Sequence, residues 1–130
     1  MSEKKLRELD AWIAEHVFGC KPQAVRIMEG RKLVRVEYHC KCTPSHVVGW
    51  SKIYSYTTNP AASMELLKKC AMRCGEIMVT YNGMFAVHGA LPRAAKATYG
   101  PSAPTLELAI AQFAIKLCQT KGVSDLLPQA

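Results

Sequence analysis

Apolar residues recur at helical spacing in three stretches of the chain. From Ser2 to Phe18 they fall every three or four positions, and Gly19 ends the pattern. A second helix is expected to begin at Pro60, because proline suits the first position of a helix, and to end at Gly75. The third, Pro104 to Lys121, is apolar nearly all round, so a sheet, other helices or a second subunit must cover it on more than one side.

Other stretches alternate between apolar and polar positions, which is the pattern of a half-buried strand. Val25–Met28 and Lys32–Cys40 are predicted to form two strands, joined at Glu29–Arg31. The segment Ile53–Tyr56 predicts a short extended piece that leads into the second helix.

The clearest hairpin signal is Asn82-Gly83, which stands between the alternating runs Ile77–Tyr81 and Met84–His88. Asn-Gly between such runs predicts a type I′ turn. The segment Ala94–Tyr99 supplies a further candidate strand. Helices and hairpins do not follow strict β-α-β alternation. The sequence therefore predicts a single α+β domain over residues 1–130, a mainly antiparallel sheet with helices packed on it in an α-β-α sandwich.

Composition narrows the class of protein. At 130 residues the chain is long enough for one core and too short for two. No apolar run approaches the roughly 18 residues that a membrane-spanning helix needs. The basic residues near the N-terminus are not followed by an apolar stretch, so neither a membrane partner nor a secretory signal is expected. Six cysteines without such a signal favour reduced thiols in a cytoplasm.

The formal net charge of +7 favours an anionic partner. The bases are scattered along the chain and never form a dense cluster, which is also typical of an ordinary solvated surface. A small anionic ligand is therefore favoured over nucleic acid as the partner.

The second predicted helix has the features of an anion site at its start. Backbone N–H groups at a helix N-terminus are unpaired and carry positive potential. Aromatic residues just upstream can stack on a base, and a second basic segment can close over phosphates. The candidate ligand-binding residues are Trp50, Tyr54, Tyr56, Thr57, Thr58, Asn59, Arg93, Lys96 and Tyr99.

Plainer interpretations of these and other polar residues stay open. Thr-Thr-Asn-Pro is also an ordinary helix cap, and aromatic residues are common in cores. The Cys and His residues of 39–46, with Cys70 and Cys74, are of the types that bind zinc, but their spacing is not a standard knuckle and buried thiols explain them as well. No nucleophile has a base and an acidic partner at a telling spacing, so neither enzyme activity nor a cofactor is expected.

Three blocks of the sequence resemble one family. Leu9–Gly19 is similar to its opening helix, Tyr56–Met64 to its Y-S-T-D-P-A-A-A-M turn, and Ala103–Ile110 to its closing helix. Together they resemble the phage ABA-sandwich domain, found in small phage and prophage proteins with an α-β-α layered fold. The chain departs from the pattern at Asn59, where the family has Asp, and at Ser63, where it usually has Ala.

The resemblance implies a phage or prophage product in the cytoplasm of a bacterial host, and it supplies no established catalytic site. Together with the candidate anion site, it leads to a hypothesis. The protein is expected to be a non-enzymatic homo-oligomer that sequesters a small nucleotide-type immune signal, such as a cyclic nucleotide, and so counteracts anti-phage defence. The alternative is an interaction protein that binds a host protein or nucleic acid through its basic surface.

Overall fold

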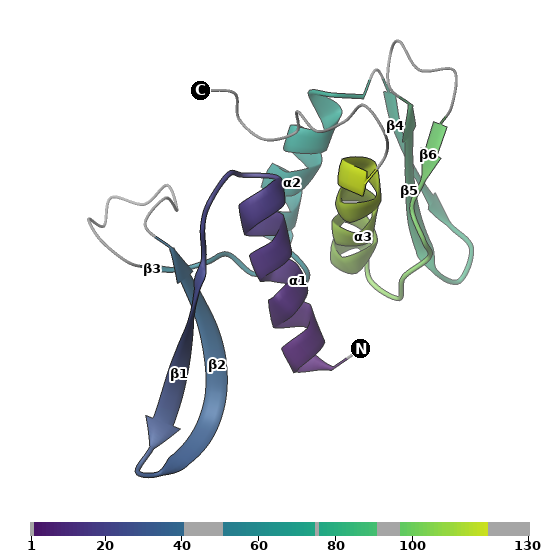
Figure 1. The fold of residues 1–130 in the computed structure, drawn as a ribbon. Helices are drawn as coiled ribbons and strands as arrows, with labels where there is room; N and C mark the ends of the chain where they lie inside the picture. Colours follow the sequence, from purple (N-terminus) through teal and green to yellow (C-terminus); the bar gives the residue numbers. More distant parts are fainter. Residues whose placement is uncertain (1, 41–50, 75, 91–96, 120–130) are drawn as a thin grey trace.

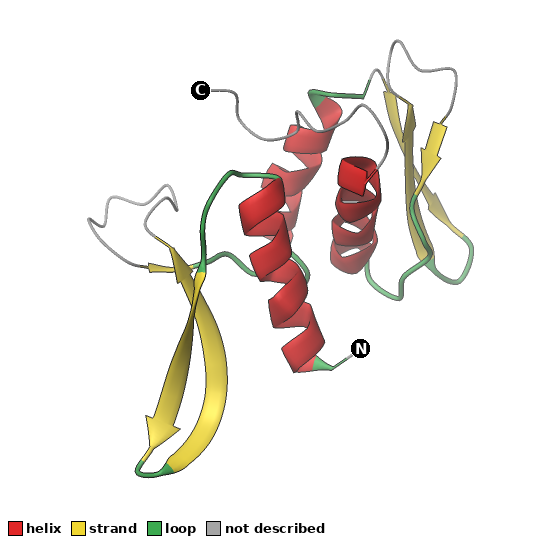
Figure 2. Cartoon of the chain, in the orientation of Figure 1, coloured by secondary structure: helices red, strands yellow, loops and turns green. Residues whose placement is uncertain are grey.

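The computed structural model describes residues 2–40, 51–74, 76–90 and 97–119. Within these residues the elements are α1 (Glu3–His16), β1 (Gln23–Glu29), β2 (Lys32–Cys40), β3 (Ser51–Lys52), α2 (Pro60–Ala71), β4 (Glu76–Tyr81), β5 (Phe85–Ala90), β6 (Ala97–Tyr99) and α3 (Leu106–Gln119). The helices lie in the middle, with β1 and β2 on one side and β4, β5 and β6 on the other (Figure 1, Figure 2).

The described strands form two antiparallel sheets, β1-β2-β3 and β4-β5-β6. In the first sheet β1 pairs with β2 along its whole length, with a bulge between Ile27 and Met28. Helix α1 lies against β2, whereas α3 lies against β5 and β6. The layers therefore run from a sheet through the helices to a second sheet.

The α+β class and the antiparallel pairing expected from the sequence are confirmed. The arrangement of the layers differs from the expected one, because the helices lie between two sheets instead of on a single sheet. In each sheet the two strands of one hairpin pair with each other, and one short strand, β3 or β6, pairs with the second of them. Alternation along a strand shows which side chains share a face, but it cannot show which hairpins share a sheet.

Helix α3 is the centre of the core. Phe113, Ile110 and Leu117 are buried in it. The helix packs against α1, α2, β5 and β6, so the same chain covers the sides that are apolar in the sequence. Its burial requires no second subunit, and the argument for an oligomer that rests on this helix is therefore removed.

Helix α1 buries Ile13 and Ala14 against this core. It begins at a cap, because the Ser2 hydroxyl accepts a hydrogen bond from the Lys5 N–H at 3.2 Å. After the helix the chain reverses at Gly19, whose φ of 74° lies in the left-handed region that favours glycine. The helix expected from the sequence is confirmed to within two residues at each end.

The segment Ile53–Tyr56 leads into α2 as expected and is not part of a strand, since β3 covers only Ser51–Lys52. One local expectation is wrong. The second hairpin does not use a type I′ turn, which needs positive φ at both central residues. Asn82 keeps a negative φ and only Gly83 is left-handed, within a three-residue loop over 82–84.

The described cysteines are in two states. Cys20 is disulfide-bonded, which contradicts the expectation of reduced thiols at that position. The free thiols among the described residues are Cys40, Cys70, Cys74 and Cys118.

Burial raises the pKa of the Cys70 thiol to about 12, and the neighbouring Cys74 and Cys118 add to this effect. Burial also raises the pKa of Cys118 to about 11, and that of Cys74 in the same direction. The folded protein therefore holds these thiols protonated at a pH where an unfolded chain, with an ordinary thiol pKa of 9.0, ionises them.

We expect the free energy of unfolding to fall as the pH rises above 9.0, because the unfolded chain then releases thiol protons that the folded protein retains. The contribution of Cys70 is complete below 9.0 and is lost as the pH approaches about 12. Urea denaturation across this range measures the effect. The variant Cys70→Ala should show a weaker pH dependence, and an unchanged dependence would contradict the role of this thiol.

Gly100 is expected to tolerate no side chain. A Cβ atom there would lie 2.8 Å from the Val87 carbonyl oxygen and 3.0 Å from Phe113 Cβ, neither of which can move freely. Gly100→Ala should therefore destabilise the protein by about 1–3 kcal/mol in urea denaturation. Gly30→Asn is the control, because Gly30 has open space around it and Asn tolerates its positive φ. Equal losses in the two variants would contradict the packing argument.

Candidate functional site

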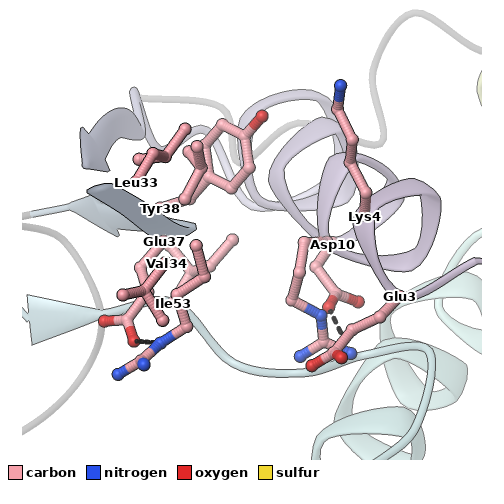
Figure 3. Close-up of a pocket in the computed structure, with 11 residues that line it drawn as sticks. Glu3, Lys4, Asp10, Leu33, Val34, Glu37, Tyr38 and Ile53 are labelled. Carbon is pink, nitrogen blue, oxygen red and sulfur yellow. Dashed lines mark hydrogen bonds and ion pairs between the residues drawn. The ribbon is translucent and has the colours of Figure 1, made fainter. Parts of the chain in front are cut away.

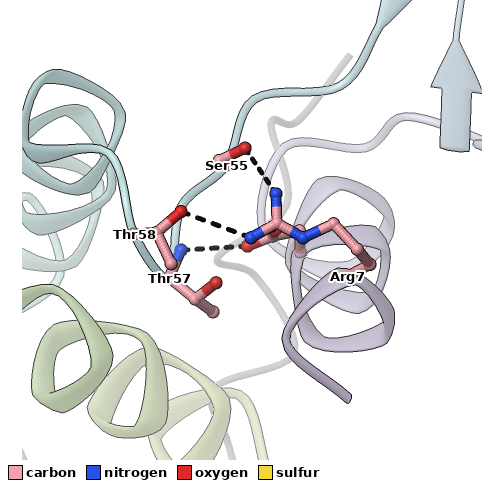
Figure 4. Close-up of polar contacts among 5 residues, drawn as sticks. Arg7, Ser55, Thr57 and Thr58 are labelled. Atoms are coloured by element: carbon pink, nitrogen blue, oxygen red, sulfur yellow. Dashed lines mark hydrogen bonds and ion pairs between the residues drawn. The ribbon is translucent and has the colours of Figure 1, made fainter. Parts of the chain in front are cut away.

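Two charged residues of α1 hold the turn that precedes α2 (Figure 4). Asp10 is buried, and its Oδ1 accepts a hydrogen bond from the Thr57 N–H at 2.9 Å. Arg7 Nη2 lies 3.3 Å from Asp10 Oδ2 and donates to Thr58 Oγ1 at 3.3 Å. Arg7 Nη1 donates to Ser55 Oγ at 2.7 Å. We call this set of contacts the Arg7–Asp10 clamp.

The clamp gives the carboxylate of Asp10, which lies on the apolar face of α1, an ion pair and a hydrogen bond. Asp10 lies one turn from Leu6 and one turn from Ile13, so the helix carries its side chain into the core. A buried carboxylate is stable only when a cation and hydrogen-bond donors surround it. The guanidinium of Arg7 and the backbone N–H of Thr57 supply both.

The backbone donors at the start of α2 are used within the protein. Asn59 Oδ1 accepts the Ala62 N–H at 3.1 Å, as a helix cap does. The N–H groups of Thr58 and Asn59 both donate to the Ser55 carbonyl oxygen. The N–H of the preceding residue, Thr57, donates to Asp10 in the clamp, and Pro60, which begins the helix, has no N–H. The protein's own oxygens therefore accept from Thr57, Thr58, Asn59 and Ala62, which leaves the Ala61 N–H from the row of donors expected from the sequence.

The two described aromatic residues of this turn have different environments. Tyr56 is buried, with its ring stacked on Phe18 at a centroid distance of 5.0 Å. Burial, followed by the nearby Cys40, Tyr54 and Asp10, raises the pKa of the Tyr56 hydroxyl above its usual range. Tyr54 meets the edge of Tyr56 at 6.1 Å and is 41% exposed. Tyr56 is thus a core residue, and Tyr54 presents a ring to solvent.

The other candidates from the sequence are not part of this turn. Tyr99 is exposed on β6, in the second sheet, where its ring lies 5.1 Å from that of His88. Trp50, Arg93 and Lys96 lie outside the described residues. The structure therefore brings the candidates of 54–59 together and places Tyr99 elsewhere.

A groove of about 480 Å³ lies between the first half of α1 and strand β2 (Figure 3). Its β2 side is largely apolar, with Val34, Val36 and the ring of Tyr38, and Ile53 extends this wall. Its α1 side is polar and includes Lys4 together with both residues of the clamp. One wall can contact an apolar or aromatic group while the other offers charges and hydrogen bonds.

The charges that line the groove are largely paired. The clamp pairs one base with one acid, and Arg35 Nε donates to Glu37 Oε2 at 2.7 Å. His39 Nε2 lies 3.2 Å from the other oxygen of the same carboxylate. Lys4 and Glu3, at the N-terminal end of α1, add one charge of each sign. The groove is therefore close to neutral and suits a ligand of low net charge.

Sequence reasoning did not find this groove. The available signal was Asp10, an acid in the middle of an apolar helix face with Arg7 one turn before it. A charge in that position requires a partner from another element. The β2 wall had no comparable signal, because alternation does not identify the helix that a strand will face.

The described residues give no support to a metal centre or to a membrane span. No three His, Cys, Asp or Glu side chains gather among them in a way that could hold a metal ion. Cys42 and His46, two of the possible zinc ligands, lie outside those residues. None of the helices that the structure describes has the length and apolar character needed to cross a bilayer.

We expect Asp10→Ala to destabilise the protein by about 2–4 kcal/mol, because it leaves the Thr57 N–H and the Arg7 guanidinium without their acceptor. Asp10→Asn is the matched control, since its side-chain oxygen can still accept from Thr57. It should lose distinctly less stability in urea denaturation. Amide hydrogen exchange at Thr57 should accelerate in the alanine variant only. Equal behaviour of the two variants would contradict the role of this hydrogen bond.

The chain matches no protein-family profile, no curated protein sequence and no solved structure.

Proposed function

We propose that the protein is a non-enzymatic binding protein that holds a small nucleotide-type ligand in the groove between α1 and β2. The observation that carries the proposal is the groove itself. Its volume of about 480 Å³ falls within the range of roughly 300–1,000 Å³ that small-molecule sites occupy. The turn before α2, which the sequence favoured as the site, contacts Arg7 and Asp10 and so holds two residues that line the groove.

The two walls of the groove match the two parts of a nucleotide. The ring of Tyr38 and the aliphatic side chains of Val34 and Val36 provide an apolar surface for a base. Lys4 and the positive end of the α1 dipole lie at the other wall, where a phosphate can be neutralised. Neither interaction requires chemistry on the ligand, so sequestration is sufficient as a function.

The near-neutral lining restricts the ligand further. Glu3, Asp10 and Glu37 lie among the bases and oppose a polyphosphate. A cyclic nucleotide has one charge per phosphate and a rigid shape, so it loses less on entering such a groove than a nucleoside triphosphate does. The ligand class proposed is therefore a cyclic nucleotide, in keeping with a phage or prophage protein that removes an immune signal in the cytoplasm of its host.

The proposal is tested by thermal unfolding of the protein with a panel of cyclic mononucleotides and dinucleotides, with ATP as the highly charged comparison. A ligand that binds only the folded protein raises its stability by about 2.7 kcal/mol at a hundredfold excess over Kd. We expect a rise in Tm with at least one cyclic nucleotide and a smaller rise with ATP. A panel without any shift would remove the proposal.

Val34→Trp should abolish that shift by filling the groove. The control is Val79→Trp on β4, outside the groove, because the two valines are 47% and 45% exposed and the substitution has the same size. Both variants should remain folded by circular dichroism, since neither position is in the core. A shift that persists unchanged in Val34→Trp places the ligand outside the groove.

The second candidate function is an interaction protein that binds a macromolecule through a basic surface. One observation favours it, the exposed hairpin of β1 and β2, which carries several bases and extends away from the helices (Figure 1).

A further inference from the structure

The distal part of the β1–β2 hairpin, residues 23–35, projects from the body of the protein, and we call it the β arm (Figure 1). Nearly all of its residues are exposed on both faces of the ribbon. An isolated two-stranded hairpin with solvent on both sides is only marginally stable in water. The arm therefore has the geometry of a segment that becomes covered by a partner.

The charge of the β arm indicates the kind of partner. Arg26, Arg31 and Lys32 are exposed and have no ion pair with the described residues, whereas Arg35 is paired with Glu37. The arm's own acid is Glu29, so the arm carries a net positive charge at its tip. Such a ribbon is complementary to a polyanion.

The apolar residues of the β arm add a second feature. Met28 and Leu33 pair across the two strands beside the tip, and each is 48% exposed. Both side chains are too exposed to form a hydrophobic core for the arm. Next to unpaired bases they can contact the apolar groups of a partner whose outer surface is anionic.

A second copy of this chain does not fit the β arm. Antiparallel pairing of two β1 edges about their centre would set Arg26 directly opposite Arg26 of the other copy. Like charges in that position destabilise a sheet. The charge pattern therefore favours an anionic partner over self-association.

We infer that the β arm binds the major groove of double-stranded DNA. A two-stranded β-ribbon fits into the major groove of B-form DNA, which is about 12 Å wide. Arg26, Arg31 and Lys32 contact the phosphates on either side of the groove, while Met28 and Leu33 contact base edges, where the thymine methyl group is the apolar feature. The arm shares Leu33, Val34 and Arg35 with the lining of the small-ligand groove, so the two sites adjoin, but Arg26, Arg31 and Lys32 lie outside that lining.

The first test measures binding of the full chain to a fluorescent duplex of about 20 base pairs by anisotropy at several salt concentrations. Three phosphate contacts predict a slope of log K against log salt of roughly −2.7. The triple variant Arg26→Glu, Arg31→Glu, Lys32→Glu should bind at least about tenfold more weakly, with a slope near zero. A wild-type protein that does not bind the duplex overturns the inference.

The matched control reverses the same number of charges on the helices, with Lys5→Glu, Lys68→Glu and Lys69→Glu. Both triple variants therefore have the same net charge, and all the positions are at least partly exposed. The control should retain the wild-type slope. Equal losses in the two variants mean that net charge alone drives binding, and that result overturns the assignment to the arm.

The second test examines the base edges. A duplex in which uracil replaces thymine lacks the methyl groups, and it should bind wild-type protein a few-fold more weakly than the thymine duplex. The double variant Met28→Ser, Leu33→Ser should not distinguish the two duplexes. Equal affinity of wild-type protein for both duplexes overturns the contact with base edges.

A measurement of molar mass by light scattering completes the experiment. A β arm that binds DNA should take no part in self-association. A wild-type dimer that dissociates in Met28→Ser, Leu33→Ser would show that the arm joins two copies of the chain, and it would overturn DNA as the occupant.

Discussion

The hydrogen bond from the Thr57 N–H to the buried Asp10 carboxylate is the contact on which the rest of the arrangement depends. It joins α1 to the turn that begins α2, two segments that are far apart in the sequence. Arg7 makes the junction possible, because its guanidinium balances the carboxylate and also binds Ser55 and Thr58. A buried charge is tolerated only when an opposite charge and hydrogen bonds compensate it. The position of α1 relative to this turn is therefore set by electrostatics as well as by apolar packing.

The same contact explains why a turn with the sequence of an anion site offers so little to an anion. Helix starts attract negative charge, and here the negative charge comes from the protein itself. Asp10 on one side and the Asn59 cap on the other use the donors that a phosphate would need. The polar residues of the turn thus serve the fold, and the space available to a ligand lies on the far side of the clamp, between α1 and β2.

Much of the local structure could be predicted from the sequence, because periodicity is a local property. The helices, both main hairpins and the cap at Asn59 follow from spacing, proline and short polar side chains. Two features could not be predicted in this way. Which elements face one another depends on contacts between distant segments, so the division into two sheets and the groove were missed. The role of Asp10 was visible only as an acid on an apolar helix face, and its partner at Thr57 required the folded chain.

The order of the elements along the chain has a consequence for biosynthesis. Helix α3 follows every other described element, yet it is the element against which α1, α2, β5 and β6 pack. Until its Phe113 and Leu117 have left the ribosome, the helices and the second sheet lack the surface that would hold them together. The nascent polypeptide therefore exposes its apolar faces until α3 has emerged, and chaperones that bind such faces would meet it before it folds.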